Sequence, residues 1–168
     1  MAFIEIEQKY RLKDPVKARI LLKRMGARSI ASGVESNEFF DRGNELRQKK
    51  SALRLRQFGG KAVLTLKGPR QVSRFTKRME IETPVEYRSF RKILGLAGFK
   101  IVMRYKKQRE TYKIGAAEVT VDFLREFGWF LEIEGAPQAI KKIERKLGLT
   151  HTDREERSYL HMLFHQKY

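Results

Sequence analysis

Several features that would point to other classes of protein are missing from this chain. None of its 168 residues is cysteine, which excludes disulfides, thiolate metal ligands and a cysteine nucleophile. No apolar run approaches the ~20 residues of a membrane-spanning helix, and the N-terminal stretch alternates in charge and does not resemble a signal peptide. We therefore expect a soluble, cytoplasmic protein with no membrane partner.

Two widespread catalytic motifs are missing as well. There is no GxxxxGK[ST] phosphate-binding loop, and Gly59-Gly60-Lys61 is better explained as a hairpin turn. No serine lies in a nucleophile-elbow motif, so acyl transfer has no support. His161 and His165 have helical spacing but no third ligand nearby, and we interpret them as surface residues. Any phosphate binding must therefore come from other side chains.

The composition of the chain is strongly basic. It has 37 Lys and Arg against 20 Asp and Glu, a formal net charge of +17 that is spread over the whole length. Such a balance favours polyanions such as nucleic acid, anionic lipid, polyphosphate or nucleotide phosphates. With 41% hydrophobic residues and no linker, the chain is predicted to form one domain over residues 1–168.

Strand and helix signals alternate along the chain. Asp14-Pro15 supplies an N-cap and a first-turn proline for one helix, and Pro137 opens another. The predicted strands cover residues 3–12, 38–41, 52–58, 62–67, 76–83, 101–112, 117–124 and 129–134. The predicted helices cover residues 15–25, 86–96 and 137–147, with a last helix from Asp153 toward Phe164.

The tripeptide Glu-Ile-Glu occurs three times, at residues 5–7, 80–82 and 132–134. In a strand, side chains alternate between faces, so each pair of glutamates shares one face and the isoleucine points to the other. Two carboxylates at such spacing lie ~6.6 Å apart along the backbone, close enough to serve one metal ion or two.

Cations follow the same alternation. Arg54 and Arg56 oppose Leu53 and Leu55, and Lys107 and Arg109 share a face. One interpretation is an antiparallel sheet with a solvated charged face. Because five strands repeat charged pairs on one face, we favour a closed or strongly curved sheet with a polar interior and helices outside. Carboxylates there would hold hard divalent cations, and Arg and Lys would bind phosphate oxygens.

The ordered motifs resemble the CYTH superfamily, the triphosphate tunnel metalloenzymes. Glu5-Ile6-Glu7-Gln8-Lys9 is similar to its E-x-E-x-K signature, and the resemblance spans roughly residues 3 to 135. The other matching elements, in the family's order, are Phe40-Asp41, Leu53-Arg54-Leu55-Arg56, Leu64-Thr65-Leu66-Lys67-Gly68, Arg78-x-Glu80-x-Glu82, Lys107-x-Arg109, Asp122 and Glu132-Ile133-Glu134, with Ser158-Tyr159 similar to a C-terminal helix of the family.

The resemblance implies an α+β fold, a closed eight-stranded antiparallel β-tunnel with helices packed outside. It implies Mg²⁺ or Mn²⁺ as the cofactor, with Lys9 orienting or activating the nucleophile. The implied metal ligands are Glu5, Glu7, Asp122, Glu132 and Glu134. The implied triphosphate-binding residues are Arg54, Arg56, Lys67, Arg78, Lys107 and Arg109, with Glu80 and Glu82 as supporting acids that pair with neighbouring cations.

Three functions remain open at this point. The resemblance places first an enzyme like the class IV adenylyl cyclases, which convert ATP to cyclic AMP and pyrophosphate. A triphosphatase acting on inorganic triphosphate or thiamine triphosphate is the alternative. A non-catalytic module that binds RNA or polyphosphate is the third, but paired carboxylates would repel a polyanion unless metals intervene, so we do not expect a nucleic acid partner. We expect a monomer or a homodimer.

Overall fold

The structure is a computed structural model that describes residues 2–165. Its strands are β1 (Ala2–Arg11), β2 (Arg28–Asp41), β3 (Ala52–Phe58), β4 (Lys61–Lys67), β5 (Thr76–Pro84), β6 (Lys100–Ile114), β7 (Ala117–Leu124) and β8 (Gly128–Glu134). Its helices are α1 (Pro15–Arg24), α2 (Glu45–Gln48), α3 (Tyr87–Leu96), α4 (Pro137–Leu147) and α5 (Tyr159–Phe164), with a short 3₁₀ helix η1 (His151–Asp153). No helix in this described range is long and apolar enough to cross a membrane.

The eight strands form a closed barrel in the order β1, β5, β4, β3, β2, β6, β7 and β8. The β3–β4 ladder illustrates how the register sorts side chains, because Leu53 lies opposite Leu66 while Arg54 lies opposite Thr65. Directly opposed residues in an antiparallel pair point to the same face. Apolar residues thus gather on one face of this hairpin and polar residues on the other. The closed strand order confirms the predicted eight-stranded antiparallel barrel.

The chain divides into two compact units, which we describe separately. Unit 1 contains Ala31–Arg109 together with the start of the chain up to Glu5. Unit 2 contains Ile6–Ile30 and the residues from Glu110 onward. The domain bounds of 1–168 stay a prediction.

In unit 1, helix α3 covers the apolar face of the β3–β4 hairpin. Leu94 of α3 forms a buried cluster with Phe40, Leu53 and Leu55. Since alternation puts Arg54 and Arg56 on the opposite face, packing of the leucines against α3 directs the arginines away from the helix. The hairpin turn at Gly59 and Gly60 has φ values of 56° and 76°, the left-handed conformation that glycine tolerates best.

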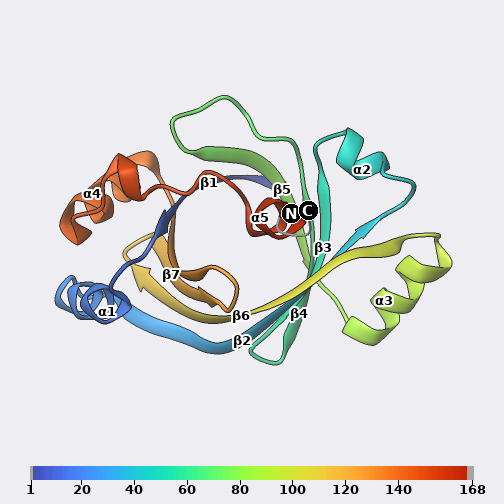
Figure 1. Ribbon diagram of the computed structural model, residues 1–168. Helices are drawn as coiled ribbons and strands as arrows, with labels where there is room; N and C mark the ends of the chain where they lie inside the picture. The colour runs from blue at the N-terminus through green and yellow to red at the C-terminus, as the bar shows by residue number, and fades with distance from the viewer. Residues whose placement is uncertain (1, 166–168) are drawn as a thin grey trace. The chain divides into compact units, whose positions relative to one another are not determined.

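In unit 2, the apolar face of β7 and β8 packs under α4. Val121 and Ile133 are fully buried on the strands, and Ile140 is fully buried on the helix. Helix α1 lies beside α4 (Figure 1). It begins as predicted, with the Asp14 carboxylate accepting a hydrogen bond from the Lys17 backbone N–H at 2.9 Å. The opposite face of β7 and β8 carries the acidic residues.

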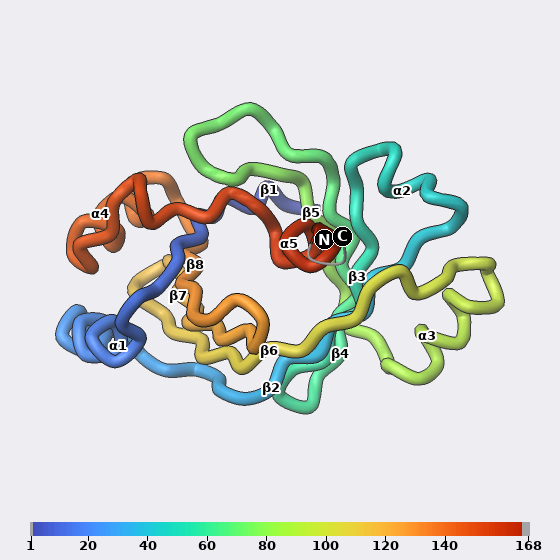
Figure 2. The backbone as a smooth tube through the Cα atoms, viewed as in Figure 1, coloured from blue at the N-terminus to red at the C-terminus, as the bar shows by residue number. Residues whose placement is uncertain are grey.

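Two predicted boundaries were wrong. Strand β2 begins at Arg28, well before the predicted residue 38. The last helix begins at Tyr159 instead of Asp153, with the Ser158 hydroxyl accepting from the His161 N–H as its N-cap. Asp153 instead closes a capping box with Thr150 that starts only the short helix η1. The chain then runs back beside β1 (Figure 2). There Arg154 forms a β-bridge with Tyr10.

Candidate functional site

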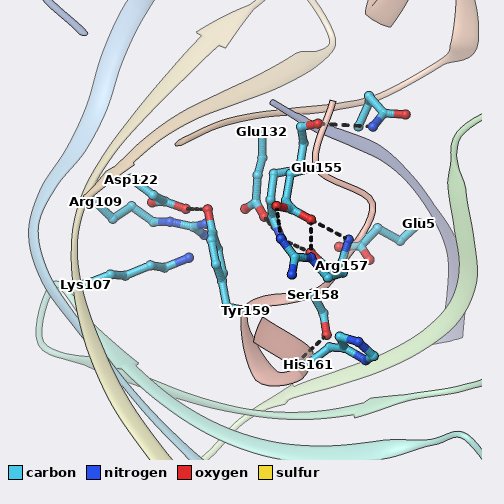
Figure 3. Close-up of polar contacts among 12 residues, drawn as sticks. Glu5, Lys107, Arg109, Asp122, Glu132, Glu155, Arg157, Ser158, Tyr159 and His161 are labelled. Carbon is cyan, nitrogen blue, oxygen red and sulfur yellow. Dashed lines mark hydrogen bonds and ion pairs between the residues drawn. The ribbon is translucent and has the colours of Figure 1, made fainter. Parts of the chain in front are cut away.

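Four cations of unit 1 surround one buried carboxylate, that of Glu35 on β2. Lys107 Nζ lies 3.4 Å from Glu35 Oε1, and Arg109 Nη1 lies 3.3 Å from Oε2. Arg56 Nη1 approaches Oε2 at 3.9 Å, and Arg54 adds its charge to the same environment. Figure 3 shows Lys107 and Arg109 extending in the same direction. We call Arg54, Arg56, Lys107 and Arg109 the basic cluster.

The electrostatics of the basic cluster favour an anion. Burial would raise the pKa of Glu35, but Arg109, Lys107 and the two other cations hold that pKa far below its ordinary value. Burial also acts to lower the pKa of Arg54, but Glu35 and other charges raise it above its usual range. Burial and the neighbouring Arg54 lower the pKa of Arg56. Like charges are thus crowded together in a desolvated place, which an anionic ligand would relieve.

A second carboxylate, Glu82 on β5, faces the same arginines. Glu82 Oε1 lies 3.6 Å from Arg54 Nη2 and 3.8 Å from Arg56 Nη2. The Thr65 hydroxyl donates to Glu82 at 2.7 Å, and the Asn37 amide donates to Glu35 at 2.9 Å. In the ion pairs described, the four cations of the basic cluster therefore share the carboxylates of Glu35 and Glu82. The remaining positive charge is suited to binding phosphate oxygens.

Lys67 of β4 lies between two other acids of unit 1. Its ammonium donates to Glu80 and lies 3.3 Å from Glu5 Oε2. Burial, together with a hydrogen bond to Glu80, raises the pKa of Glu5 to about 7 even though Lys67 acts in the opposite direction. Two carboxyl groups as close as Glu5 and Glu80 favour a shared proton, so this pair changes charge near neutral pH.

The raised pKa of Glu5 predicts a pH dependence of stability. Its folded-state pKa of about 7 exceeds the ordinary 4.5, so its contribution to stability is complete below about pH 4.5 and is lost as pH rises through 7. The loss is on the order of 3 kcal/mol for a shift of that size. In urea denaturation of the metal-free protein, the free energy of unfolding is expected to fall by this amount between pH 5 and 8. Glu5→Gln is expected not to show this fall.

The matched control for that experiment is Glu45→Gln, an exposed carboxylate on helix α2 that pairs only with Arg42 at 3.3 Å among the contacts described. Its pH profile is expected to follow that of the unmodified protein. Parallel profiles for Glu5→Gln and the unmodified protein would show that Glu5 titrates in its ordinary range.

In unit 2, polar residues form rows across three strands. Glu7 of β1 lies opposite Glu134 of β8, which lies opposite Glu118 of β7. In the next row Lys9 lies opposite Glu132, which lies opposite Thr120. Directly opposed residues share a face, so Glu7 of β1 and Glu134 of β8 face one another, whereas Glu132 faces Lys9. The third row holds Arg11, Phe130 and Asp122.

Lys9 is the most enclosed cation of these rows, with 5% of its surface exposed. Its ammonium lies 3.3 Å from Glu132 Oε1 and donates to the Arg157 carbonyl oxygen at 3.1 Å. The same ammonium lies 3.8 Å from the centre of the Tyr159 ring. Lys9 is thus held by β8 and by the chain around α5.

The segment that precedes α5 is fixed by charge. Glu155 accepts two hydrogen bonds from the Arg157 guanidinium at 2.8 Å each (Figure 3). It accepts a further one from Arg11 at 2.6 Å. The hydrogen bonds from Arg157 are the main reason that the pKa of Glu155 is lowered to about 2, so this carboxylate stays ionised at neutral pH. The Glu155 N–H also donates to the Lys9 carbonyl at 3.0 Å, which continues the pairing beside β1.

The structure brings most of the predicted site residues together within each unit. In unit 1, the predicted cations of β3 and β6 form the basic cluster, and Lys67 lies with Glu5 and Glu80. Arg78 is half-buried on β5, two residues before Glu80 and therefore on its face. In unit 2, Lys9 pairs with Glu132 and Glu7 faces Glu134, whereas Asp122 lies across from Phe130 and accepts a hydrogen bond from Tyr159.

Sequence reasoning missed three acids. Glu35 lies at the centre of the basic cluster, Glu118 extends the row of Glu7 and Glu134, and Glu155 anchors the segment before α5. The strand signal that would have found Glu35 is weak, because the segment from Arg28 to Asn37 contains a glycine and three serines. Glu118 carries a stronger signal, since Glu118, Thr120 and Asp122 alternate with Val119 and Val121.

The donor chemistry of unit 2 fits a hard divalent cation. Glu7, Glu134 and Glu118 offer only carboxylate oxygens, which Mg²⁺ and Mn²⁺ prefer. Within residues 2–165 no three histidine or acidic side chains converge closely enough to hold a metal by themselves. Mg²⁺ usually takes one or two carboxylates and completes its shell with water and substrate phosphates, so a facing pair such as Glu7 and Glu134 fits that mode.

The fold is a closed antiparallel barrel, and its strands carry opposed carboxylates and buried cations. The family model described as "CYTH domain" matches residues 4–159, and the chain belongs to this family. The CYTH enzymes, or triphosphate tunnel metalloenzymes, generally depend on a divalent metal.

Individual relatives agree with this assignment. A candidate adenylate cyclase of Methanocaldococcus jannaschii is 32% identical over 147 residues, which cover 86% of this chain and 83% of that protein. The structure of a candidate adenylate cyclase from Vibrio parahaemolyticus has a TM-score of 0.85 at 25% identity and covers 96% of this chain and 98% of its own. HpAC1 from Hippeastrum, described as a candidate adenylyl cyclase with a dominant triphosphatase activity, shares the fold with a TM-score of 0.70 at 20% identity, over 97% and 96% of the two chains.

Proposed function

We propose that this protein is a divalent-metal-dependent enzyme that acts on a triphosphate chain. Of the two candidate reactions, we favour the conversion of ATP to cyclic AMP and pyrophosphate. The observation that carries the proposal is the basic cluster, in which four cations share the buried Glu35 and the partly exposed Glu82. A phosphate chain supplies the negative charge that such a cluster lacks. The similarity to candidate adenylate cyclases supports the choice of ATP.

The proposed roles follow from the chemistry of each side chain. Mg²⁺ or Mn²⁺ would polarise the phosphorus under attack, held by Glu7 and Glu134 with Glu5, Glu132 and Asp122 as the other predicted ligands. The guanidinium groups of the basic cluster bind phosphate oxygens in pairs, and Lys67 and Arg78 extend this binding along β4 and β5.

Lys9 is the proposed catalytic residue. Its ammonium is enclosed beside Glu132, so its position is set before a substrate binds. We propose that it orients the attacking hydroxyl and stabilises the negative charge that develops on the reacting phosphate. In the cyclase reaction the ribose 3′-oxygen forms a bond to the α-phosphorus while the bond to the pyrophosphate oxygen breaks.

A triphosphatase is the second candidate function. In that reaction a water oxygen forms a bond to the terminal phosphorus while the bond from that phosphorus to the bridging oxygen breaks, so the diphosphate is the leaving group and orthophosphate is the second product. The same cations and carboxylates serve both reactions, and only the position of the triphosphate along the site differs. HpAC1, which shares this fold, has a dominant triphosphatase activity, and this supports a triphosphatase as the second candidate, with inorganic triphosphate or thiamine triphosphate as its substrate.

Product analysis tests the proposal. The purified protein is offered ATP, inorganic triphosphate and thiamine triphosphate separately, each with Mg²⁺ and with Mn²⁺. Cyclic AMP with pyrophosphate supports the cyclase, and orthophosphate without cyclic nucleotide supports the triphosphatase. No turnover of any of the three would contradict the enzyme assignment and favour a binding module.

Lys107 and its neighbour on β6 provide a matched pair of variants for the same assay. Lys107 is buried beside Glu35 whereas Lys106 is exposed. Lys107→Met is expected to raise KM by roughly 10- to 100-fold, because a charged hydrogen bond to phosphate contributes about 1.5–3 kcal/mol. Lys106→Met removes the same charge from the opposite face and is expected to leave KM within about twofold. Equal effects of the two variants would mean that only net charge matters.

A further inference from the structure

We propose that Tyr159 is a positioning residue that holds the Lys9 ammonium in its working place through the face of its ring. The proposal rests on the proposed function, in which Lys9 acts on the reacting phosphate. All of its observations lie within unit 2, on β1, β7, β8 and the start of α5.

Tyr159 is itself held from two directions. It is 5% exposed, and its hydroxyl donates to Asp122 Oδ2 at 3.0 Å (Figure 3). Its ring meets Phe130 edge-on, with ring centres 5.4 Å apart and an angle of 78° between the planes. A hydrogen bond at one end of the ring and an aromatic contact along it leave the ring little freedom to turn.

The fixed ring then faces Lys9. The Lys9 ammonium lies 3.8 Å from the ring centre, well inside the range of a cation–π contact. The same ammonium lies near Glu132 Oε1 and donates to the Arg157 carbonyl. Residues of β8 and of the chain before α5 therefore also confine it. A ring face attracts an ammonium without bringing a formal negative charge. Tyr159 therefore restricts the amine while leaving its positive charge for a phosphate.

Asp122 takes a specific part in this arrangement. It is fully buried, and its Oδ2 accepts a hydrogen bond from the Tyr159 hydroxyl. We assign to Asp122, through Oδ2, the role of fixing the tyrosine in addition to its predicted place among the metal ligands, so its effect on Lys9 is indirect.

The first test measures the geometry without any substrate. In protein labelled with ¹³C-lysine, the Lys9 ε-CH₂ signal is expected to be shifted upfield by the Tyr159 ring, and it is identified by its loss in Lys9→Arg. Tyr159→Phe keeps the ring and is expected to keep the shift, whereas Tyr159→Leu is expected to abolish it. An ordinary lysine shift in the unmodified protein would overturn the proposal.

The second test separates positioning from general stability. Tyr159→Leu is expected to lower kcat about 10-fold on the triphosphate that the enzyme turns over, with KM within about twofold. That loss corresponds to the roughly 1–2 kcal/mol of a desolvated cation–π contact. Tyr159→Phe is expected to restore kcat to within about threefold. Tyr159→Met replaces the leucine variant if that variant does not fold.

Phe164→Leu, an aromatic-to-leucine change in the same helix α5, is the control for loosening of the helix and is expected to leave kcat within about twofold. An equal loss of kcat in Tyr159→Phe and Tyr159→Leu would overturn the role of the ring. The absence of turnover on all triphosphates, with the upfield Lys9 signal present, would remove the proposed function while the placement of Lys9 by Tyr159 stands.

Discussion

Glu7→Gln and Glu134→Gln are each expected to reduce metal-dependent turnover on the order of 100- to 1000-fold, because each removes a proposed ligand whose metal stabilises the reacting phosphate by several kcal/mol. The fold is expected to survive, since glutamine has nearly the same shape. Glu7 and Glu134 lie directly opposite each other, and like charges in that position are destabilising. The melting temperature without metal is measured beside turnover, so that a loss of folding is distinguished from a loss of metal binding.

Glu126→Gln supplies the matched control, because Glu126 is an exposed carboxylate in the turn between β7 and β8. It is expected to leave turnover and Mn²⁺ affinity, measured by calorimetry, within about twofold. Undiminished Mn²⁺ affinity and turnover in the double variant Glu7→Gln/Glu134→Gln would remove both residues from the metal site.

Glu35→Gln is expected to lower the free energy of unfolding by about 3–5 kcal/mol, the typical cost of leaving buried charges without their partner. Glutamine keeps the volume and can still accept from Asn37, so the loss is one of charge. Lys107 and Arg109 would then face each other without the carboxylate that now lies within 3.4 Å of both. Urea denaturation measures the effect.

Added inorganic triphosphate gives this prediction a second readout. It is expected to raise the melting temperature of Glu35→Gln more than that of the unmodified protein, because the ligand restores negative charge to the basic cluster. Glu38→Gln, on the same strand, is the control. Glu38 is also buried, but it pairs with Arg91 and Arg104, which are 43% and 60% exposed and can be solvated without it, so its loss is expected to cost about 1–2 kcal/mol, less than that of Glu35. Equal destabilisation by the two variants would contradict the central role of Glu35.

The parts of the fold predicted from the sequence are those with strong local signals. The β3–β4 hairpin follows from two alternating runs around Gly59-Gly60, and α1 follows from Asp14-Pro15. Alternation of Leu53 and Leu55 with Arg54 and Arg56 also predicted which face would be polar. These signals lie within a few residues of one another, so no knowledge of distant contacts was needed.

The first half of β2 and the place of Glu35 were beyond local reasoning. The segment before residue 38 has few branched apolar residues, and only its last two residues, Ser36 and Asn37, have described partners on β3. Glu35 looks like an ordinary surface glutamate until the sheet brings β6 beside it. Its importance depends on Lys107 and Arg109, which lie far along the chain.

The last helix was misplaced for a different reason. Thr150 and Asp153 are a capping pair, and such a pair ordinarily opens a longer helix. Here the backbone of Arg154 and Glu155 pairs with β1 instead, which ends η1 after one turn. Tertiary pairing outweighed a correct local signal.

The contacts of Lys9 have a consequence for how the protein is made. Lys9 is synthesised before Arg157 and Tyr159, which enclose it, and 148 residues separate Lys9 from Arg157. Contacts between such distant residues form slowly because a long loop must close first. A nascent chain can therefore fold much of β1 and the β3–β4 hairpin while its proposed catalytic amine is still unenclosed, and activity is expected to arise only after synthesis has passed Tyr159.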